Sequence, residues 1–113
     1  MSAVIHLTSA AEDDQQHALR CAAVLRDNES LALDDVTLLL HREGVWIATT
    51  DSPERDRLVE LLDSGVSATI GTTCLDARDI PHDDVPAGID LVDSGVSELV
   101  RLQSAGHEYV KIP

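Results

Sequence analysis

One thiol is the residue best placed to do chemistry in this sequence. Cys74 follows the apolar run Val66 to Gly71, which has the pattern of a buried β-strand. A thiol just past such a strand would lie at the rim of a sheet, where backbone N–H groups of a following helical turn would stabilise its thiolate. The alternative is that Cys74 is a small buried hydrophobe, as free cysteine commonly is. Nearby, Asp76 and Asp79 disfavour a thiolate and Arg78 favours one, so the sequence leaves its reactivity open.

Supporting candidates follow from position near the thiol. Thr73 and Arg78 flank it in sequence, and His41 ends a second apolar run, where an imidazole that titrates near neutrality could orient or deprotonate a group beside Cys74. A solvated or capping histidine is the simpler interpretation of His41. His82 could approach the same rim, but no CxxC or HxxxH spacing accompanies these residues, so no metal site is predicted.

The second cysteine is predicted to be structural. Cys21 falls on the inner face of a predicted helix, where apolar neighbours would block access to its sulfur. A disulfide between Cys21 and Cys74 would require the inside of that helix to meet the rim of a strand. The first strand-to-helix turn, Thr8-Ser9-Ala10-Ala11, has no glycine and is therefore neither a Walker loop nor a dinucleotide fingerprint, so no cofactor is predicted.

The elements that must position these residues alternate between apolar runs and helical patterns. The expected strands are Ala3–Thr8, Val36–Leu40, Val66–Gly71, Ile89–Val92 and Glu108–Ile112. The expected helices run from a Ser9–Glu12 capping box to Asn28, from Arg55 to Asp63 after the start signal Asp51-Ser52-Pro53, and from Ser94 or Gly95 to Ala105. Gly44–Thr50 is expected to form a helical turn, and Leu75–Pro86 a mobile loop, with or without one helical turn.

This alternation predicts one α/β domain spanning residues 1–113. Right-handed crossovers place helices on both faces of a mostly parallel five-stranded sheet, giving three layers, α/β/α. Ligands in such sheets bind beyond the carboxyl ends of the strands, which again selects His41 and the segment ending at Cys74.

Charge excludes several kinds of partner. Acidic residues number 21 against 8 basic ones, giving a formal net charge of −13, and Lys111 is the only lysine. Such a surface repels nucleic acid and anionic membranes. No apolar run is long enough to cross a bilayer and the first residues lack the pattern of a signal peptide, so a cytoplasmic protein is expected. The acidity itself is typical of proteins from salt-loving organisms, where dissolved salt screens the self-repulsion.

The closing stretch carries a resemblance to a known family. The segment Val92–Gln103, followed by Gly106–Pro113, together with the order of elements, resembles the DsrE-like (YchN-like) family over essentially the whole chain. In some members a strand-end cysteine, like that in Gly71-Thr72-Thr73-Cys74, receives sulfur as a persulfide, and the resemblance gives that role to Cys74 alone. It also implies a homo-oligomer, a trimer or stacked trimers, working with sulfur donor and acceptor proteins.

Two functions follow as hypotheses. The first is an intracellular sulfur carrier or sulfurtransferase that accepts sulfane sulfur on Cys74, a reaction of thiolates that needs no cofactor. The second is a non-catalytic oligomeric protein that binds a partner or small ligand, with Cys74 filling space. Trp46 would suit the second as an interface anchor, or else folds back over its own sheet.

Overall fold

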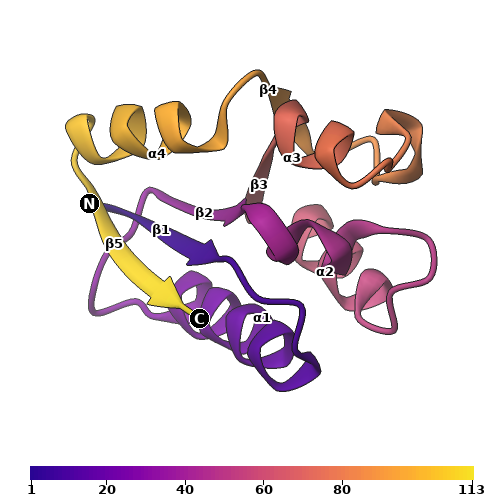
Figure 1. Cartoon of the computed structure of the whole chain (residues 1–113). Coiled ribbons are helices and arrows are strands. Elements are labelled where there is room, and N and C mark those ends of the chain that lie inside the picture. The colour runs from indigo at the N-terminus through magenta and orange to yellow at the C-terminus, as the bar shows by residue number, and fades with distance from the viewer.

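A five-stranded parallel sheet forms the centre of the molecule. The computed structural model describes all 113 residues, and Figure 1 shows the sheet with helices above and below it. The strand order is β4-β3-β2-β1-β5, and all four pairings are parallel. The strands are β1 (Ser2–Leu7), β2 (Asp35–Leu40), β3 (Ser67–Gly71), β4 (Asp90–Val92) and β5 (His107–Ile112).

Burial on both faces explains why the central strands read as continuous apolar runs. Every residue of β1 after Ser2 and of β2 after Asp35 is buried. Parallel strands need crossover connections, and these connections cover both sides of the sheet with helices. The strands expected from the sequence therefore all form, each within a residue or two of its predicted ends.

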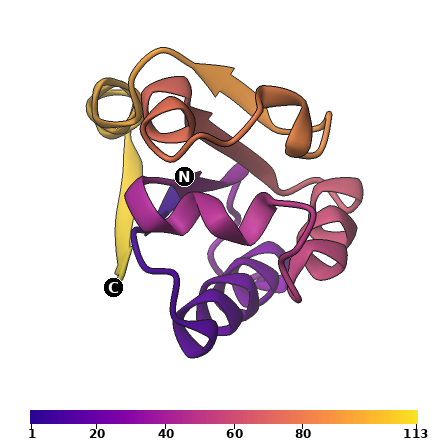
Figure 2. The same cartoon turned by 45° about the vertical axis from the view of Figure 1, so that its right-hand side comes forward.

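The connections form four α-helices and two short 3-10 helices. They are α1 (Glu12–Asp27), η1 (Arg42–Ala48), α2 (Arg55–Asp63), α3 (Thr72–Ala77), η2 (His82–Asp84) and α4 (Gly95–Ser104). Figures 1 and 2 show α1 on one side of the sheet and α4 on the other, with α3 beside α4. The expected α/β fold with a parallel five-stranded sheet is confirmed.

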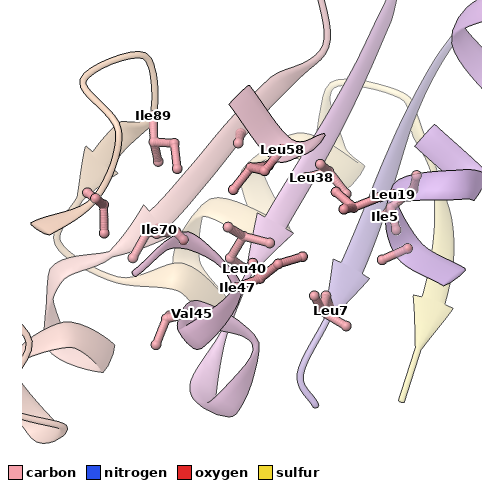
Figure 3. Packing of buried hydrophobic residues seen from close by; sticks show 14 of the residues in the cluster. Ile5, Leu7, Leu19, Leu38, Leu40, Val45, Ile47, Leu58, Ile70 and Ile89 are labelled. Atoms are coloured by element: carbon pink, nitrogen blue, oxygen red, sulfur yellow. The ribbon is translucent and has the colours of Figure 1, made fainter. Parts of the chain in front are cut away.

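The hydrophobic core lies on the face of the sheet that α1 covers. Ile5 and Leu7 of β1 pack in one cluster with Leu38 and Leu40 of β2 and with Leu19 of α1, as Figure 3 shows. All five side chains are at most 1% exposed. Aliphatic side chains thus fill the core of a chain that contains no phenylalanine.

The predicted start of the first helix is wrong by two residues, because the N-cap is Ala11 and not Ser9. α1 begins at Glu12 with Ala11 as its N-cap, and no side chain caps it. The Ser9 hydroxyl instead donates to Asp14 and accepts the N–H of Ala11, which makes a local turn before the helix. The sequence has the spacing of a capping box, but the Ser9 hydroxyl accepts the N–H of Ala11 and not the N–H of Glu12 that a capping box would use.

The segment after β3 is more helical than expected. Residues Thr72–Ala77 form α3 directly at the end of the strand, where a loop was expected to begin just after Cys74. Ile80 and Val85 are buried in the core and anchor the rest of the segment. The predicted turn around Gly44–Thr50 is confirmed as η1.

The strand order creates a switch point between β1 and β5. β1 to β4 follow one another across the sheet in one direction, whereas β5 adds to the other side of β1. Ligands of parallel sheets bind beyond the carboxyl ends of strands at such a point.

None of the helices is long and apolar enough to cross a membrane.

Candidate functional site

Cys74 lies on the first turn of α3, immediately beyond the carboxyl end of β3. Its side chain is 8% exposed and belongs to the hydrophobic core cluster. The position after the third strand agrees with the sequence prediction. The predicted exposure of the thiol at the rim of the sheet is wrong, because α3 begins directly after β3 and turns the thiol inward toward η1.

A backbone N–H is directed at the Cys74 sulfur. The amide of Arg42, the first residue of η1, donates to Sγ at 3.3 Å. Arg42 has φ 52°, a left-handed conformation that non-glycine residues rarely adopt. The sequence predicted that N–H groups of a turn after Cys74 would face its sulfur. In the structure the N–H of Arg42, just beyond the end of β2, faces it instead.

Arg78 binds the backbone of Cys74. Its guanidinium donates to the Cys74 carbonyl at 3.1 Å and to Glu43 at 2.8 Å. Glu43 also accepts a bond from the Trp46 indole at 3.0 Å, and these two partners lower the pKa of the Glu43 carboxyl. Trp46 packs partly against the core, so it folds back over its own domain. Arg78 therefore holds η1 and α3 together around Cys74.

Three side chains on the α4 side of the sheet form a hydrogen-bonded chain. His6 of β1 lies at its centre, with Nδ1 2.7 Å from the Tyr109 hydroxyl and Nε2 3.0 Å from Nδ1 of His41. His41 directly precedes Arg42, and its ring lies against Gly95 at the start of α4. The chain thus runs from β5 across β1 to the end of β2, one residue before Arg42.

Burial keeps this chain neutral. The pKa of His6 is lowered from 6.5 to about 4, mainly by burial and further by the charges of His41 and Lys111. The pKa of His41 is also lowered, by burial and by the positive charges of Arg42, Arg78 and Lys111. Burial raises the pKa of Tyr109. At neutral pH both imidazoles are uncharged, and each has one donor and one acceptor nitrogen.

Lys111 lies at the switch point of the sheet. It pairs in register with His6, and its ammonium donates to the Thr8 hydroxyl at 2.9 Å, just beyond the end of β1. The only lysine of a chain with net charge −13 thus stands at the edge where parallel sheets bind ligands. The site as a whole spans the carboxyl ends of β3, β2, β1 and β5.

The remaining sequence candidates lie apart from this site. Thr73 is exposed and makes no side-chain hydrogen bond, and His82 pairs instead with Asp76 at 2.7 Å. Cys21 is half-buried, with its sulfur 3.7 Å from Nε2 of His17. No three His, Cys, Asp or Glu side chains converge as a metal site would require.

Sequence reasoning missed His6, Tyr109 and the Arg42 amide. A backbone donor leaves no trace in residue type. His6 did leave a signal, since it is the one ionisable residue within the apolar run of β1. Tyr109 lies 103 residues from His6, so only the pairing of β1 with β5 shows that they meet.

Solved structures of similar fold cover nearly the whole chain. A protein of unknown function from Methanobacterium thermoautotrophicum, MTH1491, shares 25% identity with a TM-score of 0.86, over 97% of each chain. The ychN protein of E. coli shares 20% identity with a TM-score of 0.76, over 98% of this chain and 99% of that one. BT1422 from Bacteroides thetaiotaomicron, also of unknown function, shares 16% identity with a TM-score of 0.81, over 98% and 94%.

Sequence comparison identifies the family. No curated protein matches this chain significantly. The model of the DsrE/DsrF-like family, however, matches residues 1–112, which is nearly the entire sequence. The resemblance seen in the closing stretch is therefore confirmed, and the chain belongs to the DsrE/DsrF-like family.

Proposed function

We propose that this protein is a sulfur carrier that accepts sulfane sulfur on Cys74. The Cys74 thiolate attacks the outer sulfur of a donor persulfide and forms a new S–S bond. The bond between the two donor sulfurs breaks, and its electron pair leaves on the donor thiolate. A later acceptor thiolate removes the outer sulfur from Cys74 in the same way. No oxidant or cofactor is consumed in either step.

One observation carries the proposal within this family: the Arg42 N–H lies 3.3 Å from the Cys74 sulfur. A cysteine that only fills space needs no donor, and here the donor comes from a residue in a left-handed conformation. Backbone conformations of this kind are costly and gather at functional sites. Arg78 adds a guanidinium next to the same residue.

The burial of Cys74 favours the competing function. At 8% exposed, the thiol also suits a structural cysteine in a non-catalytic protein that binds a partner or small ligand. The two functions differ in one respect, which is whether sulfur reaches Sγ. For a carrier, the surrounding η1 and α3 must part enough for the donor persulfide to reach the sulfur.

Mass spectrometry of the intact protein tests the proposal. The reduced protein is incubated with glutathione persulfide, and the wild type is expected to gain one sulfur atom while Cys74→Ser gains none. Cys21→Ser is the matched control and should load like the wild type. Loading that persists in Cys74→Ser, or that never occurs in the wild type, rules out the carrier function.

We also propose a cytoplasmic homo-oligomer as the working form. Both cysteines are free, as a reducing compartment requires. Val96 and Val100 lie four residues apart on α4 and are 56% and 61% exposed, so they offer an apolar strip for contact between copies. Light scattering of the purified protein measures whether a trimer or stacked trimers form.

A further inference from the structure

Positive charge gathers at the carboxyl ends of the strands in a chain that is otherwise strongly acidic. Basic residues number 8 against 21 acidic ones. Besides burial, the charges of three of the eight, Arg42, Arg78 and Lys111, lower the pKa of His41, and no carboxylate is among the groups that shift it. This edge of the sheet therefore has the opposite sign of charge from the chain as a whole.

Short contacts link Lys111 to His41. The N–H of His41 donates to the Leu7 carbonyl at 3.0 Å. Thr8, the next residue, accepts a bond from the Lys111 ammonium at 2.9 Å. Lys111 also pairs in register with His6, whose Nε2 lies 3.0 Å from Nδ1 of His41. The ends of β1, β2 and β5 therefore bring an imidazole and an ammonium together.

Two of the three cationic side chains lack a carboxylate partner. Arg78 is paired with Glu43. The Lys111 ammonium, in contrast, contacts only neutral oxygens, one of a hydroxyl and one of a backbone carbonyl. Arg42 is exposed, and only its backbone N–H is bonded, so its guanidinium is free to present two parallel N–H donors to an oxoanion. Both positive charges are therefore free to meet an anion from solvent.

His41 also presents an unused nitrogen. Its Nε2 has no partner in the protein and is not among the buried atoms that lack one, so it reaches solvent. When the Tyr109 hydroxyl donates to His6 and His6 donates to His41, Nε2 of His41 carries the proton and is a donor. An anion at Nε2 therefore selects this arrangement of protons.

The start of α4 covers the same ring without offsetting the positive charge. A Cβ on Gly95 would lie 3.1 Å from the ring of His41, so the helix begins against it. Glu98 in the first turn is bonded to Arg101. Asp93, before the helix, is exposed and is not among the groups that shift the pKa of His41. Since the N-terminal end of a helix carries partial positive charge, α4 adds to the attraction for an anion.

We propose that His41, Arg42 and Lys111 form a binding site for a small divalent oxoanion of the sulfate and thiosulfate class. The guanidinium and the ammonium supply charge, and the Nε2–H of His41 supplies a further donor. The acidic surface elsewhere repels such ions, so one site per chain is expected. Thiosulfate carries a sulfane sulfur and so agrees with a sulfur carrier, but binding of the ion does not require the thiol of Cys74.

Calorimetric titration with sodium thiosulfate and with sodium sulfate tests the site. At pH 7, with sodium chloride holding the ionic strength constant, the wild type should bind one equivalent of either ion. Lys111→Gln and Arg42→Gln should each weaken binding about tenfold or more, because each removes a hydrogen bond to a charged group. Arg20→Gln, which removes the same charge from an exposed arginine of α1, is the matched control and should bind like the wild type.

The histidine rings report where the ion binds. A bound anion favours the imidazolium, so thiosulfate should raise the pKa of His41 in a ¹H NMR titration. The signals of His17, which is exposed on α1, should not respond to the ion. An ion that binds without moving the pKa of His41 would place the binding elsewhere and overturn the proposed site.

Cys74→Ser separates this site from the carrier function. The variant should bind thiosulfate like the wild type, although it cannot accept sulfur. The site is refuted if the wild type shows no saturable binding, if Arg42→Gln and Lys111→Gln bind as tightly as the wild type, or if Arg20→Gln binds as weakly as they do. None of these results bears on the carrier function, which is decided by the loading of Cys74 from glutathione persulfide.

Discussion

Acidification should destabilise this protein through His6. The pKa of the ring is 6.5 when unfolded and about 4 in the fold, because burial and the charges of His41 and Lys111 oppose the imidazolium. The unfolded chain therefore binds more protons than the native one between these two values, so stability is fully present above pH 6.5 and is lost as the pH falls toward 4. Each pKa unit is worth about 1.4 kcal/mol, so the full loss is about 3 kcal/mol.

Geometry gives the same sign. Nε2 of His6 faces Nδ1 of His41 at 3.0 Å, and Nδ1 faces the Tyr109 hydroxyl. A protonated His6 donates from both nitrogens, which fixes His41 as an acceptor and brings a charge beside Lys111. The cost is electrostatic, and an uncharged amide at position 6 does not incur it.

Urea unfolding from pH 7.5 to 4.5 measures the effect against His6→Gln. The variant should be less stable at pH 7.5, because it loses hydrogen bonds worth about 1–3 kcal/mol. The two stabilities should then converge as the pH falls, since only the wild type pays for protonating His6. Protonation of the 21 acidic residues affects both proteins and cancels in the difference. His17→Gln, at an exposed histidine, should run parallel to the wild type.

A constant difference between the wild type and His6→Gln across this range would refute the reasoning. It would mean that His6 is protonated equally easily in the folded and unfolded chains. The buried, neutral pair would then not exist in solution.

Two further predictions concern close packing and charge. Gly44→Ala would place a methyl group 2.0 Å from the Leu7 carbonyl oxygen and push η1 away from β1, so the free energy of unfolding should fall by about 1–3 kcal/mol. The control is Gly88→Ala, because the nearest neighbour of its methyl group would be 3.7 Å away. Equal stabilities of the two variants in urea would contradict the predicted clash at Gly44. Raising KCl to molar concentration should raise the melting temperature, because the net charge of −13 repels itself and the screening length falls to ~3 Å at 1 M; a melting temperature that stays constant or falls would show that the acidic surface does not limit stability.

The fold was largely predictable because its signals are local. Apolar runs flanked by turns located all five strands, and the order of elements then limited the topology. The start of α1 was wrong because Ser9 has a second partner, Asp14, that competes with the capping role. Propensity and spacing cannot show which of several nearby groups a hydroxyl will choose.

The site was only partly predictable because its contacts are not local. The position of Cys74 after β3 came from the pattern, but its inward direction depends on α3 beginning at Thr72. Successive residues of a helix point about 100° apart, so when Cys74 faces the core Thr73 faces solvent. The same rotation therefore explains why one candidate was right in position and the other does not join the site.

The two faces of the sheet differ in polarity. Parallel sheets covered on both faces usually carry apolar residues throughout. Here Ile5 and Leu7 of β1 join the core on the α1 side, while His6 between them faces α4. Thr37 and Thr69 follow the same alternation on β2 and β3, and both are buried. Polar groups beneath a helix lower stability unless they are bonded, and two of these are bonded: His6 contacts Tyr109 and His41, and the Thr37 hydroxyl donates to Asp35.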